Sequence, residues 1–195
     1  MTNLACQRGG RVVFRDLSFA VEAGRLLAVE GVNGAGKTSL LRMIAGFIAP
    51  LQGAIAFDEE GEITDAEDRG KLIGWLGHQD AVKSQLTPHE SLHFFVGLYG
   101  ATADADVALE AVGLSRVAGL PCQYLSAGQK KRLALARLRM SGRPVWLLDE
   151  PLASLDAEGR ELVKSMIATH CAGGGIAIAA THETIAETSE RLTLS

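Results

Sequence analysis

The chain has 195 residues, a formal net charge of −4 and a hydrophobic fraction of 47%, values typical of one globular domain. This acidic balance offers no basic face, so we expect no nucleic-acid partner. No apolar run approaches the ~20 residues of a membrane-spanning helix, and the amino terminus has no signal-peptide core, so we expect no membrane span. Cys6, Cys122 and Cys171 are far apart in the sequence, which favours free, buried thiols.

The first 80 residues combine short apolar runs with one periodic helix. In chain order the sequence predicts strands at 12–21 and 25–30, a glycine-rich loop, a helix at 38–47, a strand at 53–57, an acidic loop at 58–68 and a strand at 72–76. The acidic segment has seven carboxylates among eleven residues, which is why we expect a solvated loop there.

Residues 81–132 turn helical, with helices expected at 87–100, at 106–114 and from 128 onward to 140. Thr87 suits the N-cap of the first helix, Pro88 its first position and Glu90 the capping-box position. The same stretch contains HESLH, a pattern that binds zinc in some hydrolases. Because no third ligand has a supporting environment, we interpret HESLH as a helix start.

The last third of the chain alternates strands and helices. It predicts a strand at 144–149, a helix at 155–171 and a strand from 174 that ends at a histidine. This alternation indicates an α/β fold with a mostly parallel sheet and helices packed around it. We expect a single domain over 1–195, with a core formed by 1–80 and 133–195 and an inserted helical lobe at 81–132.

Residues 31–38, GVNGAGKT, match the phosphate-binding loop G-x-x-x-x-G-K-[ST] between a predicted strand and a predicted helix. The glycines let backbone N–H groups point at phosphate oxygens, and the helix adds its positive amino-terminal end. Lys37 is expected to reach the β- and γ-phosphates, and the Thr38 hydroxyl to bind Mg²⁺. The sequence therefore predicts a nucleotide site.

Two carboxylates, Asp149 and Glu150, follow an apolar strand directly. Ligands of parallel sheets bind at the carboxyl ends of the strands, so both side chains are expected near the phosphates. Asp149 is in the position of an acidic residue that holds Mg²⁺. Glu150 is placed to orient and deprotonate a water molecule for attack on the γ-phosphate.

Residues 124–138, YLSAGQKKRLALARL, provide a second candidate anion site, because a serine–glycine loop opens a helix. A single γ-phosphate does not require two separate anion-binding sites from the same chain. Two chains arranged head to tail can use both, with Ser126, Gly128 and Gln129 of one chain closing over the nucleotide of the other.

Together these motifs resemble the ATP-binding cassette ATPases over nearly the whole chain. LSAGQ is similar to the family's signature loop, and SLD at 154–156 to its D-loop. Gln79 matches the Q-loop glutamine and His182 the switch histidine. The resemblance implies a P-loop NTPase fold with an antiparallel β portion and an inserted helical lobe, ATP and Mg²⁺ as cofactors, and a second cassette as partner.

The resemblance also implies roles for individual residues. Glu150, His182 and Gln79 would be catalytic, and Thr38, Gln79 and Asp149 would hold the metal. Nucleotide binding would fall to Gly31, Val32, Asn33, Gly34, Ala35, Gly36, Lys37, Thr38, Ser39, Ser126, Gly128, Gln129 and Asp156.

Four stretches, GHQ, LTPHESLHFF, LSAGQKKRLALARL and WLLDEPLASLD, most resemble the haem-exporter ATPases of cytochrome c maturation. This resemblance implies ATP-driven haem export or haem release during c-type cytochrome biogenesis. It also implies membrane permease subunits as partners, at the cytoplasmic face of a bacterial inner membrane. His78, His89, His93 and His170 are scattered in the sequence, so we expect no direct haem ligand in this chain. A transporter ATPase for another substrate and a non-transport cassette ATPase remain open alternatives.

The sequence departs from the family at the base-binding position. Many cassette ATPases stack adenine on an aromatic residue before the phosphate loop, whereas no aromatic residue precedes Phe14 here. Arg8 lies near that position, where its plane could stack on a base or be solvated. We therefore predict weak discrimination between nucleotide bases.

Overall fold

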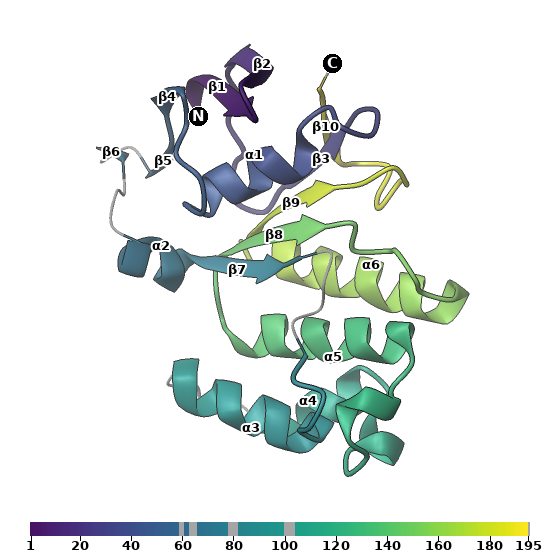
Figure 1. Ribbon diagram of the computed structural model, residues 1–195. Coiled ribbons are helices and arrows are strands. Elements are labelled where there is room, and N and C mark those ends of the chain that lie inside the picture. Colours follow the sequence, from purple (N-terminus) through teal and green to yellow (C-terminus); the bar gives the residue numbers. More distant parts are fainter. Residues whose placement is uncertain (59–60, 63–65, 78–81, 100–103, 195) are drawn as a thin grey trace.

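The computed structural model describes residues 1–58, 61–62, 66–77, 82–99 and 104–194. At its centre is a five-stranded parallel sheet in the order β10-β3-β9-β8-β7 (Figure 1). Its strands are β3 (Leu26–Glu30), β7 (Ile73–Leu76), β8 (Val145–Asp149), β9 (Ile176–Ala180) and β10 (Glu190–Thr193). Helices α1 (Lys37–Ile44) and α6 (Ala157–Ala172) pack on opposite faces of this sheet (Figure 1). The predicted α/β class is confirmed.

A smaller antiparallel portion lies beyond α1, and both ends of the described chain lie on this side of the molecule (Figure 1). Three strands form a sheet in the order β2-β1-β4: β1 (Thr2–Arg8), β2 (Arg11–Leu17) and β4 (Gln52–Ala54). Strands β5 (Ala56–Asp58) and β6 (Gly61–Glu62) pair as a short antiparallel ribbon.

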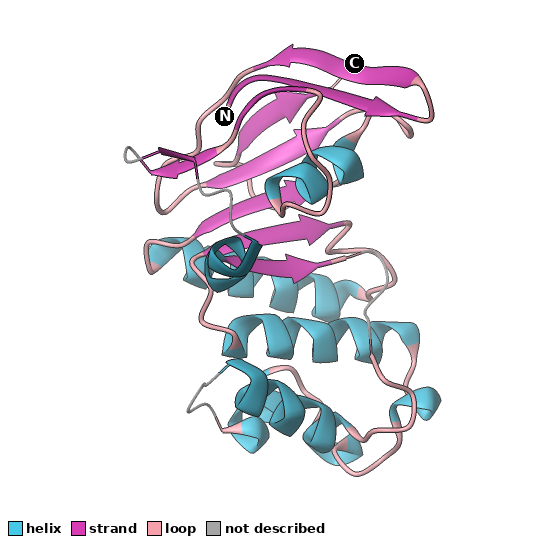
Figure 2. Ribbon diagram, turned by 60° about the vertical axis from the view of Figure 1, so that its left-hand side comes forward, coloured by secondary structure: helices cyan, strands magenta, loops and turns pink. Residues whose placement is uncertain are grey.

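The remaining helices are α2 (Ala66–Leu72), α3 (Pro88–Tyr99), α4 (Ala105–Ala111) and α5 (Ala127–Met140), with 3₁₀ turns η1 (Ser115–Val117) and η2 (Cys122–Tyr124). Helices α3, α4 and α5 lie on the α6 side of the central sheet, away from the antiparallel strands (Figure 2), whereas α2 lies beside β7 with Arg69 over the ring of Phe57. Helices α3 and α4 pack on α5, and α5 packs on β7 and α6. Helix α5 therefore connects the outer helices to the sheet.

Two buried clusters flank the central sheet, and alternate residues of each strand contribute to opposite clusters. In β8, Leu147 faces the cluster around α1, whereas Trp146 and Leu148 face the cluster around α5 and α6. Both faces are covered at the centre of the sheet, which explains why the sequences of β3, β8 and β9 are nearly continuous apolar runs without polar alternation. All three cysteines are free and buried, as predicted, and burial raises the pKa of each thiol.

The sequence prediction was wrong about several strands of the antiparallel portion and the sheet edge. The strand predicted at 12–21 ends at Leu17, and β1 was not predicted. In β1 three consecutive residues are buried and two irregularities interrupt its register with β2, so the period of two that marks a strand is lost. Strand β10 was also missed, because its residues at the sheet edge are mostly exposed.

The segment at 58–68 is not entirely a loop. Gly61–Glu62 forms β6, which pairs with β5, and α2 begins at Ala66. The predicted strand at 53–57 is divided between β4 and β5, which belong to different sheets. Acidic composition indicated exposure but could not exclude local pairing. The parts of the loop prediction at 59–60 and 63–65 lie outside the described residues.

The helix start within HESLH is confirmed. The Thr87 backbone N–H donates to Glu90 Oε2 at 2.8 Å, and the Glu90 N–H donates to Thr87 Oγ1 at 3.2 Å. This reciprocal pair is the predicted capping box. The hydrogen bonds from the Thr87 backbone and hydroxyl lower the pKa of the Glu90 carboxyl. The rings of His89 and His93 lie one turn apart on α3, with centroids separated by 5.5 Å.

His170, in the last turn of α6, packs flat against Trp146 of β8, with ring centroids 3.9 Å apart. Its Nε2–H donates to the Ile176 carbonyl at 3.2 Å. Burial lowers the pKa of His170 below its usual value of 6.5. The unfolded chain therefore binds this proton at a higher pH than the folded chain, and the free energy of unfolding falls as the pH drops below about 6.5.

We expect the wild type to lose more stability between about pH 7.5 and pH 5.5 than a His170→Phe variant, which keeps the stacked ring without a titrating group. Urea denaturation at both pH values measures this difference. His93→Phe, at an exposed position of α3, is the control and should keep the wild-type pH dependence. If the free energy of unfolding depended on pH equally in the wild type and in His170→Phe, His170 would not be the source of the stability loss.

Candidate functional site

The predicted phosphate-binding loop lies between β3 and α1, as the sequence indicated. Gly31, Gly34 and Gly36 have positive φ angles of 146°, 88° and 103°. At Gly36 a Cβ would lie 2.5 Å from Val13 Cγ1 and 3.0 Å from Phe14 Cδ1. Glycine is required there because the backbone is left-handed and β2 packs directly against the loop.

Lys37 is 8% exposed and its side chain turns back over the loop. Its Nζ donates to the Gly31 carbonyl at 2.8 Å and to the Val32 carbonyl at 3.3 Å, and lies 3.0 Å from His182 Nε2. The cation is thus held at the centre of the loop.

Thr38 and Asp149 meet at the carboxyl end of β8. The Thr38 hydroxyl donates to both carboxylate oxygens of Asp149, at 3.0 and 3.1 Å, and Asp149 is 4% exposed. A hydroxyl and a carboxylate are oxygen ligands of the kind that Mg²⁺ prefers. The chemistry of this pair fits a bound magnesium ion.

Glu150 and His182 come from the ends of the adjacent strands β8 and β9. The Glu150 N–H donates to the Ala180 carbonyl at 2.9 Å, and Glu150 Oε1 lies 3.6 Å from His182 Nε2. His182 Nε2 also lies 2.9 Å from Asn33 Oδ1 of the loop. Glu150 has a φ of 50°, a strained conformation for a residue with a side chain, and such strain clusters at functional sites.

These residues surround a cavity of about 430 Å³. It is lined by Arg8, Val13, Asn33, Gly34, Gly36, Lys37, Thr38, Ser39, Asp149, Glu150 and His182. Gly31, Val32 and Ala35 of the predicted nucleotide-binding set do not line it, and the Val32 side chain is exposed. Arg8 and Val13 come from β1 and β2, and sequence reasoning did not identify Val13.

The signature-loop residues lie at the start of α5, outside this cavity. Ser126 and Gln129 form a capping box: the Gln129 N–H donates to Ser126 Oγ at 3.2 Å and the Ser126 N–H to Gln129 Oε1 at 2.9 Å. A Cβ on Gly128 would lie 3.2 Å from the Ser154 carbonyl oxygen. The predicted signature residues and the phosphate-binding loop therefore do not meet within one chain.

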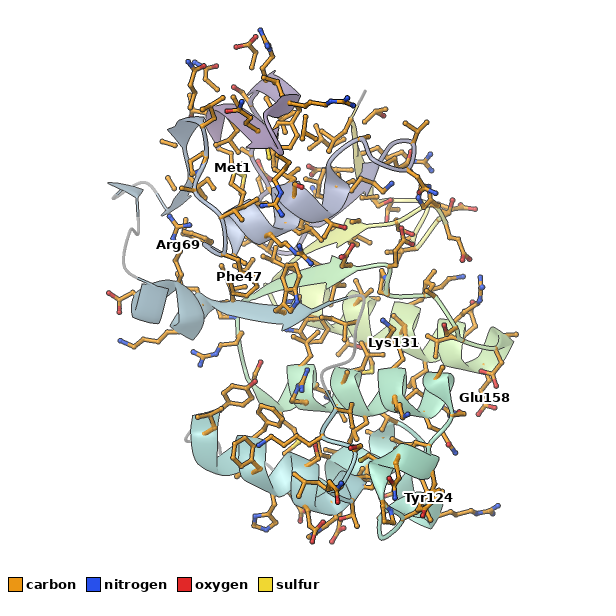
Figure 3. All side chains as sticks on the ribbon, in the orientation of Figure 1. Met1, Phe47, Arg69, Tyr124, Lys131 and Glu158 are labelled. Atoms are coloured by element: carbon orange, nitrogen blue, oxygen red, sulfur yellow. The ribbon has the colours of Figure 1, made fainter. Side chains whose placement is uncertain are left out.

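Asp156, which was predicted, and Lys131, which was not, both lie outside the lining of this cavity. Asp156 caps α6 by accepting from the Gly159 N–H at 2.8 Å, and Gln79 lies outside the described residues. Lys131 of α5 was not predicted: it is buried, and its Nζ lies 3.5 Å from the Gly77 carbonyl (Figure 3). Lysine is seldom buried, so a lysine on the apolar face of the predicted helix could have been recognised in the sequence as unusual.

Among the residues that the structure describes, no helix has the length and apolar character needed to cross a membrane. In the same part of the chain, no three histidine, cysteine or acidic side chains gather in a way that could hold a metal ion.

Comparison with known proteins gives consistent matches. The family model "ABC transporter" matches residues 14–153. A "Cytochrome c biogenesis ATP-binding export protein CcmA" from Rhodopseudomonas palustris (strain BisB5) is 50% identical over 182 residues, covering 92% of this chain and 88% of that protein. A protein of the same name from Pseudomonas syringae pv. syringae is 43% identical over 188 residues, covering 94% and 87%.

Solved structures of cassettes share this fold. An "ATP binding subunit of ABC transporter" has a TM-score of 0.86 at 23% identity, covering 99% of this chain and 84% of that one. A dimeric ATP-binding cassette in a post-hydrolysis state, bound to ADP and Pi, has a TM-score of 0.84 at 22% identity, covering 100% and 93%. Since the family model spans most of the chain and a curated relative is 50% identical over 92% of it, this chain belongs to the ATP-binding subunits of the ABC transporter family and is an ATPase of that type.

Proposed function

We propose that this chain is the ATP-hydrolysing subunit of a membrane complex that exports or releases haem during c-type cytochrome biogenesis. The observation that carries the proposal is the 50% identity, over 92% of the chain, with a relative named as a cytochrome c biogenesis ATP-binding export protein. The cavity at the end of the sheet, with its buried lysine and paired carboxylates, supports the ATPase part.

In this proposal the phosphate-binding loop holds the β- and γ-phosphates of ATP. The Lys37 ammonium would leave the Gly31 and Val32 carbonyls, which it contacts at 2.8 and 3.3 Å, and donate to phosphate oxygens instead. Backbone N–H groups of the loop and the first turn of α1 add partial positive charge. Asn33, Gly34, Gly36, Lys37, Thr38 and Ser39 line the cavity and would make these contacts.

Thr38 and Asp149 would hold Mg²⁺, together with Gln79, which lies outside the described residues. When bound, the ion supplies positive charge that balances the phosphate oxygens. The Asp149 carboxylate is already positioned by the Thr38 hydroxyl at 3.0 Å, so little reorganisation of the protein is needed.

Glu150 is proposed to accept a proton from the attacking water, and His182 to donate to the γ-phosphate and keep the water in line. The 3.6 Å separation of Glu150 Oε1 and His182 Nε2 supports this division, since both side chains face one cavity. His182 now contacts Lys37 and Asn33, so entry of phosphate would replace these contacts with a bond to the substrate.

Two chains are proposed to close head to tail over two ATP molecules. Ser126, Gly128 and Gln129 of one chain would cap the γ-phosphate held by the other, and Asp156 would lie at the same interface. The position of the signature loop outside its own chain's cavity supports this arrangement. Closure excludes water and completes the site.

We propose that residues 81–132 form a lobe that transmits closure to membrane permease subunits at the cytoplasmic face of the inner membrane. Helix α3 of this lobe leaves Phe94 47% and Leu98 64% exposed, which is unusual for large apolar side chains on adjacent turns. An apolar surface of this kind suits a permease segment. Residues 1–80 and 133–195 would remain the catalytic core.

Complementation tests the substrate assignment. The chain is expressed in a Rhodopseudomonas palustris strain that lacks its own relative, and covalent haem in c-type cytochromes is measured by haem staining. Wild type and the control Arg42→Ala, at an exposed position of α1, should restore the stain, whereas Lys37→Ala should not. Normal ATPase activity without restored stain would favour a transporter ATPase for another substrate.

The base-binding region leads to a separate prediction. Arg8 and Val13 line the cavity, and no aromatic side chain does so among the described residues. We expect GTP to bind no more than about 100-fold more weakly than ATP, a difference below about 2.7 kcal/mol. Competition of both nucleotides against a fluorescent ATP analogue measures the ratio, and a larger preference for ATP would contradict the prediction.

A further inference from the structure

Arg160, in the first turns of α6, connects two loops of the site. Its Nη1 donates to Glu183 Oε2, and its Nε donates to the Leu155 carbonyl at 3.1 Å. Leu155 belongs to the D-loop, and Glu183 directly follows His182. One guanidinium group therefore joins the D-loop backbone to the loop of the switch histidine.

The Glu183 end of this connection is held by hydrogen bonds to Thr181. The Thr181 hydroxyl donates to the Glu183 carbonyl at 3.0 Å, and the Glu183 N–H donates back to Thr181 Oγ1 at 2.9 Å. Thr181 is 1% exposed, which anchors this turn to the end of β9. Since His182 lies between these two residues, it belongs to the same hydrogen-bonded turn as Glu183.

The D-loop end lies against the signature helix. Ser154 has a φ of 65°, and its carbonyl oxygen is so close to α5 that a Cβ on Gly128 would approach it to 3.2 Å. The D-loop backbone is thus packed between the start of α5 and the Arg160 side chain. Contacts run from the signature loop through the D-loop to Arg160, Glu183 and His182.

Fold stability does not account for this pair. The Arg160 and Glu183 side chains are 38% and 43% exposed, and exposed ion pairs contribute little to the free energy of unfolding. The planar guanidinium group of arginine can, however, donate to two acceptors at once in a fixed geometry, and the ammonium group of lysine cannot reproduce that geometry.

We propose that Arg160 is a positioning residue that couples the D-loop and signature loop, which serve the partner's nucleotide, to the switch histidine of its own site. The inference rests on the proposed head-to-tail dimer. Closure of a partner on the D-loop shifts the Leu155 carbonyl, and Arg160 passes that shift to His182. The two ATP sites of the dimer are coupled by this path.

The test compares four variants in steady-state ATPase assays: Arg160→Met, Arg160→Lys, Glu183→Gln and the double variant Arg160→Met/Glu183→Gln. We expect Arg160→Met to lower kcat about tenfold, because a displaced catalytic group is costly, with KM for ATP changed less than about twofold. The Hill coefficient should fall from above 1 toward 1. Arg160→Lys should recover only part of kcat, and the double variant should be no worse than Arg160→Met.

Lys164→Met is the matched control, because it removes an exposed ion pair with Glu161 on the same helix, 2.9 Å long and remote from the cavity. Thermal midpoints of Arg160→Met and Lys164→Met should agree within about 2 °C. If Arg160→Met and Glu183→Gln both keep the kcat and Hill coefficient of this control, the inference is wrong and the dimer stands. A wild-type Hill coefficient of 1 would overturn the proposed coupled dimer together with the inference.

Discussion

Replacing Glu150 by Gln is expected to lower kcat for ATP hydrolysis by about 10²–10⁴-fold, the usual contribution of a general base. The amide keeps the shape of the side chain beside His182 Nε2, 3.6 Å away, but cannot take up a proton from water. ATP binding should be unchanged, and ATP should hold two chains together for longer than in the wild type. Phosphate release measures turnover, and size-exclusion chromatography with ATP measures dimer formation.

Glu158→Gln is the control for this result. Glu158 is an exposed carboxylate in the first turn of α6 and points away from the sheet (Figure 3). Its loss should leave kcat within about twofold of the wild type, as for a solvated surface side chain. Turnover by Glu150→Gln at the rate of Glu158→Gln would remove Glu150 from the role of base.

Replacing Lys37 by Ala is expected to weaken ATP binding by about 10²–10³-fold, or roughly 2.7–4.1 kcal/mol. The reason is the loss of charge-assisted bonds to phosphate in a site where the lysine is only 8% exposed and water screens little. Equilibrium dialysis with labelled ATP measures the dissociation constant directly. The hydrolysis rate of Lys37→Ala at saturating ATP, compared with that of the wild type, separates the loss of activity caused by weaker binding from the loss caused by slower catalysis.

Arg42→Ala tests whether this loss is specific to Lys37. Arg42 is the exposed basic residue in the last turn of the same helix, α1, at the end remote from the loop. ATP affinity of Arg42→Ala should equal that of the wild type. Weakening of ATP binding by less than about threefold in Lys37→Ala would contradict its assignment as the phosphate-binding cation.

The parts of the site that sequence reasoning located are those defined by local chemistry. The loop before α1 needs glycine at Gly34 and Gly36 because its φ angles are 88° and 103°, and this requirement appears in the sequence as a fixed spacing. The capping box predicted at Thr87 is similarly local, with its partner Glu90 three residues away. Such features are readable without knowledge of distant neighbours.

Strands whose pattern is disturbed by tertiary contacts were not found. Strand β1 carries register irregularities against β2, and β10 has little burial at the sheet edge, so neither shows a clean period of two. The acidic segment illustrates the opposite error, since composition predicted solvent exposure and said nothing of the pairing of β5 with β6.

The sequence by itself determined the chemical groups of this protein: a phosphate-binding loop, two carboxylates after a buried strand, a histidine after another strand and a serine–glycine loop that opens a helix. Only the tertiary structure decided which of them meet. The order β3-β9-β8 places His182 and Glu150 beside Lys37, and packing of α6 brings Arg160 onto Glu183. Parallel strands are joined by long crossovers, so the neighbours of each strand end are set by sheet packing and not by any local sequence pattern.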